Sequence, residues 1–574
     1  MTERSTRDRP RPAVSTVRRP APAAAAAARR AGPARWAAAA IWWAPVATAV
    51  AVMAGFGLWG LARQSAMGND EAASRWAASL SLAQLAHLLR HVDAVHGLYY
   101  LLLHGWMAAG TSPAVLRVPS VIAMVAAAAL MVILARRLTG PGRAGQLAGL
   151  FAGLVVALSP VVSYYAQTAR SYALVYACVL GQCLALLSAL QAEHAGTEQA
   201  GTEQAGTELA TTELATTGRA RIAGWWLCYG ALVTVGAYLN EMTLLVLAAH
   251  AITVGLARYG RAAVRHWAVT SAVSVALVSP LLWLSATQQN AVSWIPRPGA
   301  HDVWVLYHDY FGSTLAGAVL VTACAAAALV PAAGRRRAGR PGHETRQRHT
   351  GGVSVPSMAV PLLLVPAGLL LLESRTGLPL YQDRYVLYGQ AGAALLAGAG
   401  AARAGQWLAA AARRPELIVL PGAVLCLFAL LLLQFPAQEH ARLPASREFN
   451  FGGPSFYLAA HSRPGDAVLF MNSFYRKAEL AYPAQFRGTS DIALAVPPAD
   501  AASFEGTDKP LQAVIPLMLA RRRIWVIGRL PSLPSLLLPP GPERAESLLL
   551  LSRYTRVTKH WYTNVCLSLW VRTG

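Results

Sequence analysis

Two neighbouring stretches decide the fold: residues 41–61, IWWAPVATAVAVMAGFGLWGL, and residues 66–74, AMGNDEAAS. The first is an apolar run long enough to cross a bilayer as a helix, with tryptophans near both ends that suit the membrane interface. The second places two adjacent carboxylates, Asp70 and Glu71, just after that run. Ionised side chains beside the hydrocarbon region are costly unless they face water or a ligand. The pair therefore belongs either to an ordinary solvated loop or to a functional site at a membrane surface.

The rest of the chain repeats the apolar pattern of the first run. Of its 574 residues, 55% are hydrophobic and 13% are charged, whereas soluble domains carry about 25% charged residues. The composition therefore predicts a polytopic α-helical membrane protein with about 11–13 transmembrane helices. The candidate spans after the first are 98–110, 115–135, 145–160, 171–190, 222–239, 241–257, 267–285, 313–331, 355–372, 385–402 and 416–434.

Composition also divides the chain into three parts. Residues 1–38 are expected to be a disordered basic tail, because residues 1–35 hold nine arginines, two acids and no apolar periodicity. Residues 39–435 form the predicted transmembrane domain, and residues 436–574 a small α/β domain outside the membrane. That last part is predicted from apolar strands and a helix between them. The strands are expected at 467–470, 523–527 and 560–571, and the helix at 511–522.

The net charge of +23 does not indicate nucleic-acid binding, because aromatic and basic residues are not interleaved as in a nucleic-acid platform. Much of the charge lies in short loops, including 258–266, 332–352 and 403–414, which the positive-inside rule places in the cytoplasm. The N-terminus is then cytoplasmic and everything after 435 is extracytoplasmic, in a bacterial plasma membrane. That orientation needs an odd number of spans, one crossing away from the twelve candidate runs.

Two further segments have a readable pattern. Residues 71–90 have helical apolar spacing with polar interruptions, which predicts a helix lying in the plane of the interface. Residues 195–217 form a polar tandem repeat, which we interpret as an expansion in a cytoplasmic loop without a catalytic role.

Polar residues gather in three clusters that the topology places on the outer side. Carboxylates can act as general bases, and arginines at the ends of spans can neutralise a phosphate. The alternative for each arginine alone is a side chain that reaches up to the interface from a helix end. The clusters are Asp70 and Glu71 with Asp93 and His96; Tyr165, Gln167, Arg170 and Tyr172 after Pro160; and Arg384 with Tyr385.

The order of several short motifs resembles the GT-C superfamily of membrane glycosyltransferases. The resemblance is to bacterial relatives of protein O-mannosyltransferases and of the lipid A aminoarabinose transferase, and it covers roughly residues 41–402. The motifs in order are the Asp-Glu loop, His96-Gly-Leu-Tyr-Tyr100, Leu116-Arg-Val-Pro-Ser120, Tyr165-Ala-Gln-Thr-Ala-Arg-Ser-Tyr172 and Arg384-Tyr385.

The resemblance implies a GT-C fold and inverting transfer of a sugar, most often mannose, from a polyprenyl monophosphate donor to a hydroxyl acceptor. Asp70 would be the catalytic base, and Glu71 would orient donor or acceptor. Arg170 and Arg384 would bind the donor phosphate. The other candidate residues would line the substrate site. No cofactor is expected, and no divalent metal, because adjacent Asp70 and Glu71 make a poor cation cage.

Two functions from other classes stay open at this point. A transporter or flippase of a lipid-linked sugar would show inverted repeats and interrupted helices with midplane charges. The sequence shows no repeat of the span pattern, and its key charges lie at the outer edge. A non-catalytic envelope scaffold would leave Asp70 and Glu71 without a role. The acceptor is left open as a protein, an envelope glycan or lipid, or a secreted natural product.

Overall fold

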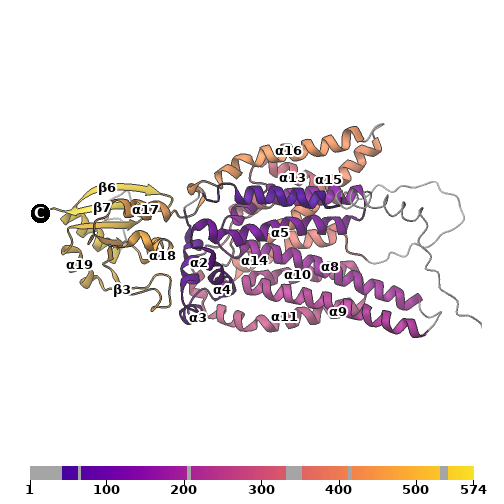
Figure 1. Ribbon diagram of the computed structural model, residues 1–574, viewed down its shortest axis with the longest axis horizontal. Helices are drawn as coiled ribbons and strands as arrows, with labels where there is room; N and C mark the ends of the chain where they lie inside the picture. The colour runs from indigo at the N-terminus through magenta and orange to yellow at the C-terminus, as the bar shows by residue number, and fades with distance from the viewer. Residues whose placement is uncertain are drawn as a thin grey trace, which may run out of the picture.

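The computed structural model describes residues 42–62, 66–202, 208–330, 352–411, 416–529 and 541–573. A bundle of long helices forms one end of the molecule and a small α/β domain the other, with short helices between them (Figure 1). The predicted class, a helical membrane protein with a small C-terminal α/β domain, is confirmed. The predicted basic tail, the centre of the repeat and nearly all of the 332–352 loop lie outside the described residues.

Eight spans of the described chain meet length and apolarity criteria for crossing a membrane, if two bent pairs count as one span each. The first pair bends by 65° where Pro160, which lacks an N–H, follows Ser159. The six continuous spans lie in α5 (Pro113–Thr139), α8 (Tyr172–Thr202), α9 (Glu208–Leu239), α11 (Arg261–Thr287), α14 (Val355–Thr376) and α16 (Glu416–His440). The bent pairs are α6 (Arg143–Leu158) with α7 (Pro160–Ala166), and α12 (Ala300–Phe311) with α13 (Leu315–Leu329).

The span predicted at 98–110 is wrong. Helix α4 covers only Gly97–Trp106, about 15 Å at 1.5 Å per residue, which is half of the roughly 30 Å hydrocarbon core. Three other helices at predicted spans do not meet the length and apolarity criteria: Trp42–Leu58 and α10 (Leu245–Ala257) are apolar but shorter, and α15 (Gln390–Ala411) is not among the candidate spans of the described chain. The odd number of crossings that the loop charges require therefore stays a prediction.

Helix α15 lies inside the bundle against α6, α13 and α14, and its small residues permit this. A Cβ on Gly398 would collide with Ala148, and one on Gly400 would collide with the carbonyl of Cys324. Glycine at these two positions lets the helix backbones approach closely, as is common where membrane helices cross.

Residues 71–90, which the sequence predicted to be one helix in the plane of the interface, form two helices. Helix α2 (Asn69–Ser79) ends at Leu80, and α3 (Leu82–Leu89) starts from Ser81, whose hydroxyl accepts a hydrogen bond from the Gln84 N–H at 3.3 Å. This side-chain cap starts a new helix and so breaks the periodicity. Helices α2, α3 and α4 lie across the end of the bundle that faces the C-terminal domain (Figure 1).

The C-terminal domain is a five-stranded mixed sheet with strand order β2-β1-β5-β7-β6. The predicted strands at 467–470 and 523–527 and the helix at 511–522 are confirmed as β1 (Ala467–Phe470), β5 (Arg523–Gly528) and α19 (Leu511–Leu519). The single strand predicted at 560–571 is wrong, because the chain reverses at Asn564, whose φ is +52°, and makes a hairpin. The remaining elements are β6 (Tyr554–Tyr562), β7 (Val565–Arg572), β2 (Ser490–Asp491), the small β3–β4 pair (Leu494–Val496, Thr507–Asp508), α17 (Gly452–His461), α18 (Lys477–Ala481) and α20 (Pro542–Arg553).

Candidate functional site

Asp70 lies in the first turn of α2, at the surface between the bundle and the C-terminal domain. Its carboxylate accepts a hydrogen bond from the Tyr172 hydroxyl at 3.1 Å and lies 3.7 Å from Nε of Arg384. The side chain is about a quarter exposed. Three segments that are far apart in the sequence therefore converge on one carboxylate that a ligand can still reach.

Arg170 is held in a fixed position by a network of side chains. It follows α7 and donates to the Tyr100 hydroxyl at 2.6 Å, to the Ser74 hydroxyl at 3.2 Å and to Asp93 at 3.1 Å. Tyr100 also donates to Asp93. Asp93 itself has a left-handed backbone, with φ +59°, and immediately precedes the short helix η1 (Ala94–His96). The network fixes the guanidinium before any ligand binds, which is the preorganisation that electrostatic catalysis needs.

Arg384 is the less constrained of the two arginines. It lies in the irregular helix η6 (Asp383–Gly389), and its backbone N–H donates to the Asp383 carboxylate at 2.8 Å. Its guanidinium lies 5.7 Å from the Tyr385 ring and makes no hydrogen bond with any described residue. A guanidinium carries five N–H donors, so Arg384 has donors available for an anionic ligand.

His96 and three tyrosines form the wall around Asp70. The Tyr172 ring lies 5.3 Å from Tyr165, 6.3 Å from His96 and 6.3 Å from Tyr385. His96 is buried, and its Nδ1 lies 3.3 Å from the Ser171 hydroxyl. Burial, together with Arg170, lowers the pKa of His96 to about 4, so the imidazole is neutral at pH 7. The wall is therefore uncharged apart from the carboxylates and arginines described above.

Glu71 faces away from this wall and forms a buried ion pair. Arg117 donates from Nε at 2.7 Å and from Nη2 at 2.8 Å, the Ala169 N–H donates at 3.0 Å, and Arg447 lies 4.0 Å away. Glu71 is 2% exposed and Arg117 is fully buried. A carboxylate enclosed in this way cannot contact donor or acceptor. The geometry makes Glu71 a positioning residue that ties α2 to α5, and not the orienting catalytic group that the sequence suggested.

Gln167 also differs from its predicted role. Its amide nitrogen donates to the carbonyls of Phe56, Gly57 and Trp59, at 3.2, 2.9 and 2.8 Å. These carbonyls lie at the end of the first helix, where the last turn lacks intrahelical donors, so Gln167 supplies hydrogen bonds there; Arg442 also donates to the Phe56 carbonyl, at 2.7 Å. With 1% of its surface exposed, Gln167 is not placed to bind a substrate.

The charges around Asp70 determine its protonation state. Burial raises its pKa, but Arg384, Arg170 and the Tyr172 hydroxyl together lower the pKa to about 2. For Glu71, burial is likewise outweighed by Arg117 and Arg447, and its pKa is also lowered to about 2. Asp70 is therefore a carboxylate at pH 7 and able to accept a proton.

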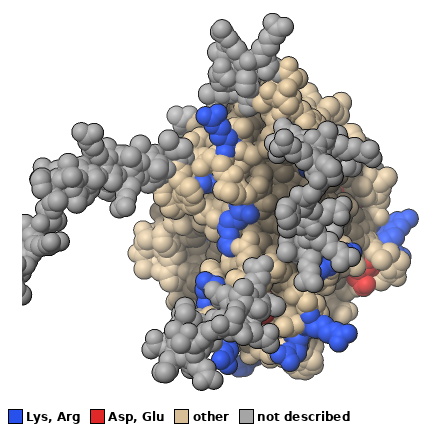
Figure 2. All heavy atoms as spheres, turned by 90° about the vertical axis from the view of Figure 1, so that its right-hand side faces the viewer, with Lys and Arg blue, Asp and Glu red and all other residues tan. Residues whose placement is uncertain are grey.

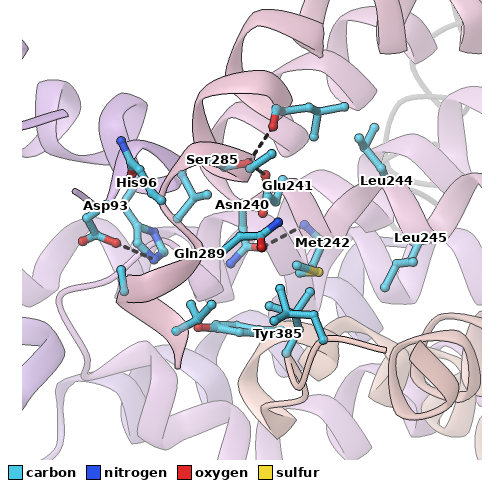
Figure 3. Close-up of a pocket in the computed structure, with 18 residues that line it drawn as sticks. Asp93, His96, Asn240, Glu241, Met242, Leu244, Leu245, Ser285, Gln289 and Tyr385 are labelled. Carbon is cyan, nitrogen blue, oxygen red and sulfur yellow. Dashed lines mark hydrogen bonds and ion pairs between the residues drawn. The ribbon is translucent and has the colours of Figure 1, made fainter. Parts of the chain in front are cut away.

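A cavity of about 480 Å³ lies next to these groups. Asp93, His96 and Tyr385 line one side of it, and leucines from α10, α11 and the segment before η6 line much of the rest. Figure 3 shows Asp93 and His96 at one end, Tyr385 along one edge and the polar side chains of residues 240, 241, 285 and 289 in the middle. The cavity combines a few polar and charged side chains with a mainly apolar lining, as ligand sites commonly do.

Comparisons with known proteins relate this geometry to a fold. No protein-family model matches the chain, and no curated protein matches it. Among solved structures, ArnT from Cupriavidus metallidurans in the apo state superposes with a TM-score of 0.55 and 13% identity, over 92% of this chain and 98% of that chain. ArnT from the same organism bound to undecaprenyl phosphate gives 0.53 and 12%, over the same shares. The chain has the GT-C fold.

In this GT-C chain the C-terminal domain holds the segment that carries Asp70. The backbone N–H of Met67, just before α2, donates to the Tyr482 hydroxyl at 2.8 Å, and the Met67 carbonyl accepts from Phe451 at 3.3 Å. Lys477 of α18 is buried beside Glu505, 3.9 Å away. Burial lowers the Lys477 pKa, and the charges of Glu505 and Asp70 offset only part of that shift. The C-terminal domain thus contributes a cation close to the site.

Three residues of the site were not assigned from the sequence. Arg117 and Tyr100 both lie in motifs that carried the resemblance, and an arginine inside an apolar run was a usable signal for the first. Arg447 has no such signal, because it reaches Glu71 from the far end of the chain. Within the described ranges, no group of three or more His, Cys, Asp or Glu side chains is placed to hold a metal ion, and metal-independent chemistry stays a prediction.

Proposed function

We propose that the protein is an inverting glycosyltransferase that moves a sugar from a polyprenyl monophosphate to a hydroxyl acceptor at the outer face of the membrane. The observation that carries the proposal is the convergence of Asp70, Arg170 and Arg384 on one accessible site. The sugar is expected to be mannose, and the acceptor an envelope glycan or lipid, a protein or a secreted product. The GT-C fold, and ArnT bound to undecaprenyl phosphate, support the lipid-phosphate class of donor.

The arginines have the chemistry that a phosphate leaving group needs. Arg384 has guanidinium donors that no described residue uses, and Arg170 adds a fixed positive charge nearby. Both stabilise the negative charge that develops as the bond between the anomeric carbon and the phosphate oxygen breaks. The lipid tail stays in the bilayer, so the interface itself positions the donor.

Asp70 has the place and protonation state of a general base. Its pKa is low while Arg384 lies 3.7 Å away. A bound phosphate would share the positive charge of Arg384, so Asp70 becomes more basic when the donor is present. It then takes the proton of the acceptor hydroxyl as that oxygen attacks the anomeric carbon. Attack opposite the departing phosphate inverts the anomeric centre.

The charge distribution supports the proposed orientation. Figure 2 shows the end of the bundle opposite the C-terminal domain, where Lys and Arg outnumber Asp and Glu on the visible described surface. The arginines of this end lie at helix termini: Arg136 and Arg137 in α5, Arg143 in α6, Arg258 after α10, and Arg261 and Arg265 in α11. By the positive-inside rule this end faces the cytoplasm, and Asp70 faces the outside of a bacterial plasma membrane.

The test is transfer of a radiolabelled sugar in membranes that contain the full chain. Decaprenyl phosphate carrying labelled mannose, glucose or arabinose is supplied, with Asp70→Asn as the test variant and Glu373→Gln, an exposed carboxylate at the end of α14, as the control. Wild type and the control should label an acceptor, and Asp70→Asn should not. Equal labelling by Asp70→Asn would remove Asp70 from the mechanism. Lipid-linked label that crosses sealed vesicles without reaching an acceptor would favour the flippase instead.

A further inference from the structure

The cavity beside the candidate site has a polar centre that the proposed chemistry does not use. Asn240 and Glu241 lie where α9 passes into η4 (Glu241–Leu244), and Ser285 and Gln289 lie at the end of α11 and just beyond it. Figure 3 shows the side chains of these four residues in the middle of the cavity, between His96 on one side and Leu244 and Leu245 on the other. Two separate loops thus bring hydrogen-bonding groups to one point.

Glu241 is a carboxylate without a cationic partner in the part of the chain that the structure describes. Its Oε2 accepts a hydrogen bond from the Ser285 hydroxyl at 2.6 Å. No Lys or Arg is among the described residues that line the cavity, and the other carboxylate there, Asp93, is already paired with Arg170. One oxygen of Glu241 therefore keeps its full capacity to accept hydrogen bonds.

Asn240 adds a donor beside this acceptor. Its side-chain oxygen accepts from the Met242 N–H at 3.0 Å, which fixes the amide with its nitrogen free of any hydrogen bond to a described residue. Asn240 is 4% exposed. A carboxylate and an amide side by side match neighbouring hydroxyl groups, which both donate and accept.

Glu241 is half-buried, and a carboxylate beside apolar side chains is unfavourable unless a ligand satisfies it. No counter-charge from the described part of the chain lines the cavity beside it, and the apolar part of the wall, including Leu244, Leu282 and Leu380, cannot hydrogen-bond to a carboxylate. Prenyl chains have no hydrogen-bond donors, so a lipid tail against Glu241 would leave the cost in place. A sugar ring has donors for Glu241 and Asn240, and C–H faces that suit the Tyr385 ring and the leucines.

We propose that Glu241 and Asn240 bind donor groups on the sugar of the lipid-linked donor and thereby select that sugar, with Ser285 as the positioning residue for Glu241. The inference rests on the proposed function, because it assumes a glycosylated lipid phosphate at Arg170 and Arg384. The group recognised is a hydrogen-bond donor on a ring carbon, either a hydroxyl or an ammonium. A polar site of this kind rejects sugars that lack the matching group, because its own groups are then left unpaired.

The experiment compares two affinities in the purified full-length protein in nanodiscs. Bare decaprenyl phosphate is the first probe, and decaprenyl phosphate carrying mannose, glucose, arabinose or 4-amino-arabinose is the second. The ratio of the two dissociation constants measures what the sugar contributes. We expect wild type to bind at least one glycosylated probe tighter than the bare phosphate, and Glu241→Ala to lose about tenfold or more of that ratio. Bare decaprenyl phosphate should bind unchanged, which also shows that the variant is folded.

Two further variants distinguish a hydroxyl ligand from an ammonium ligand and test the role of Ser285. Glu241→Gln keeps the shape and one acceptor, so it should keep most of the ratio for a hydroxyl ligand and lose it for an ammonium ligand. Ser285→Ala should lower the ratio less than Glu241→Ala does. The inference is overturned if Glu241→Ala keeps the full ratio, if it weakens both probes equally, or if no sugar improves binding to wild type. Wild type that binds bare decaprenyl phosphate no better than decaprenol would overturn the proposed function itself.

Discussion

Replacing Arg117 by alanine tests whether Glu71 positions α2 and does not take part in the chemistry. The substitution removes two charge-assisted hydrogen bonds, at 2.7 and 2.8 Å, from a carboxylate that is 2% exposed. It also removes the donor to the Ala66 carbonyl, at 2.7 Å, that holds the chain just before α2. Glu71 is left buried with the Ala169 N–H and with Arg447 at 4.0 Å.

The magnitude follows from these contacts. Hydrogen bonds to charged groups contribute about 1.5–3 kcal/mol each, and breaking a buried ion pair by removing one partner costs about 3–5 kcal/mol. Because Ala169 and Arg447 still stabilise the Glu71 charge, we expect a loss of about 3 kcal/mol, near the lower end of that range. Replacing both partners by methionine should cost less than Arg117→Ala alone, since no buried charge is then left unpaired.

The assay is the free energy of unfolding in mixed micelles during an SDS titration, in a double-mutant cycle on Arg117 and Glu71. Arg75→Ala is the matched control. Arg75 lies in α2 and also connects this helix to a neighbouring segment, but it donates to a single carbonyl, that of Leu480, at 3.0 Å. The control should cost about 1 kcal/mol. A loss below that of the control for Arg117→Ala, or a coupling energy near zero, would refute the structural role of the pair.

Three further predictions follow from the site. Arg384→Ala should weaken binding of decaprenyl phosphate about tenfold or more; unchanged affinity would mean that Arg384 only reaches to the interface. The His96 pKa is lowered to about 4, so the folded protein binds fewer protons than the unfolded chain between about pH 6.5 and 4. Stability should therefore fall as the pH decreases through that window. His96→Gln should flatten this dependence in thermal unfolding followed from pH 7.5 to 5. Gln167→Ala should lower the unfolding free energy by about 1–3 kcal/mol while transfer per folded molecule stays near wild type; selective loss of transfer would restore a substrate role.

Apolar runs predicted most of the bundle because a span needs a certain length of unbroken hydrocarbon-compatible sequence. They failed at α4, a ten-residue helix (Gly97–Trp106) that is too short to cross the membrane. Short strands behaved similarly: the run at 560–571 carried the correct β-type residues, but the reversal at Asn564 depends on one left-handed residue. Composition determines whether a segment suits lipid or the interior of a sheet. Local backbone geometry determines where that segment ends.

The candidate site shows the same limit on the scale of two residues. Asp70 and Glu71 look like one acidic pair in the sequence, but consecutive residues of a helix point about 100° apart. Once α2 forms, only one of the two can face Tyr172 and Arg384, and the other faces the buried side of the helix. Which one does so depends on Arg117 and Arg447, which approach Glu71 from distant parts of the chain. Their charges bind Glu71 and thereby leave Asp70 facing Arg384, so the helix itself separates a structural carboxylate from the candidate base.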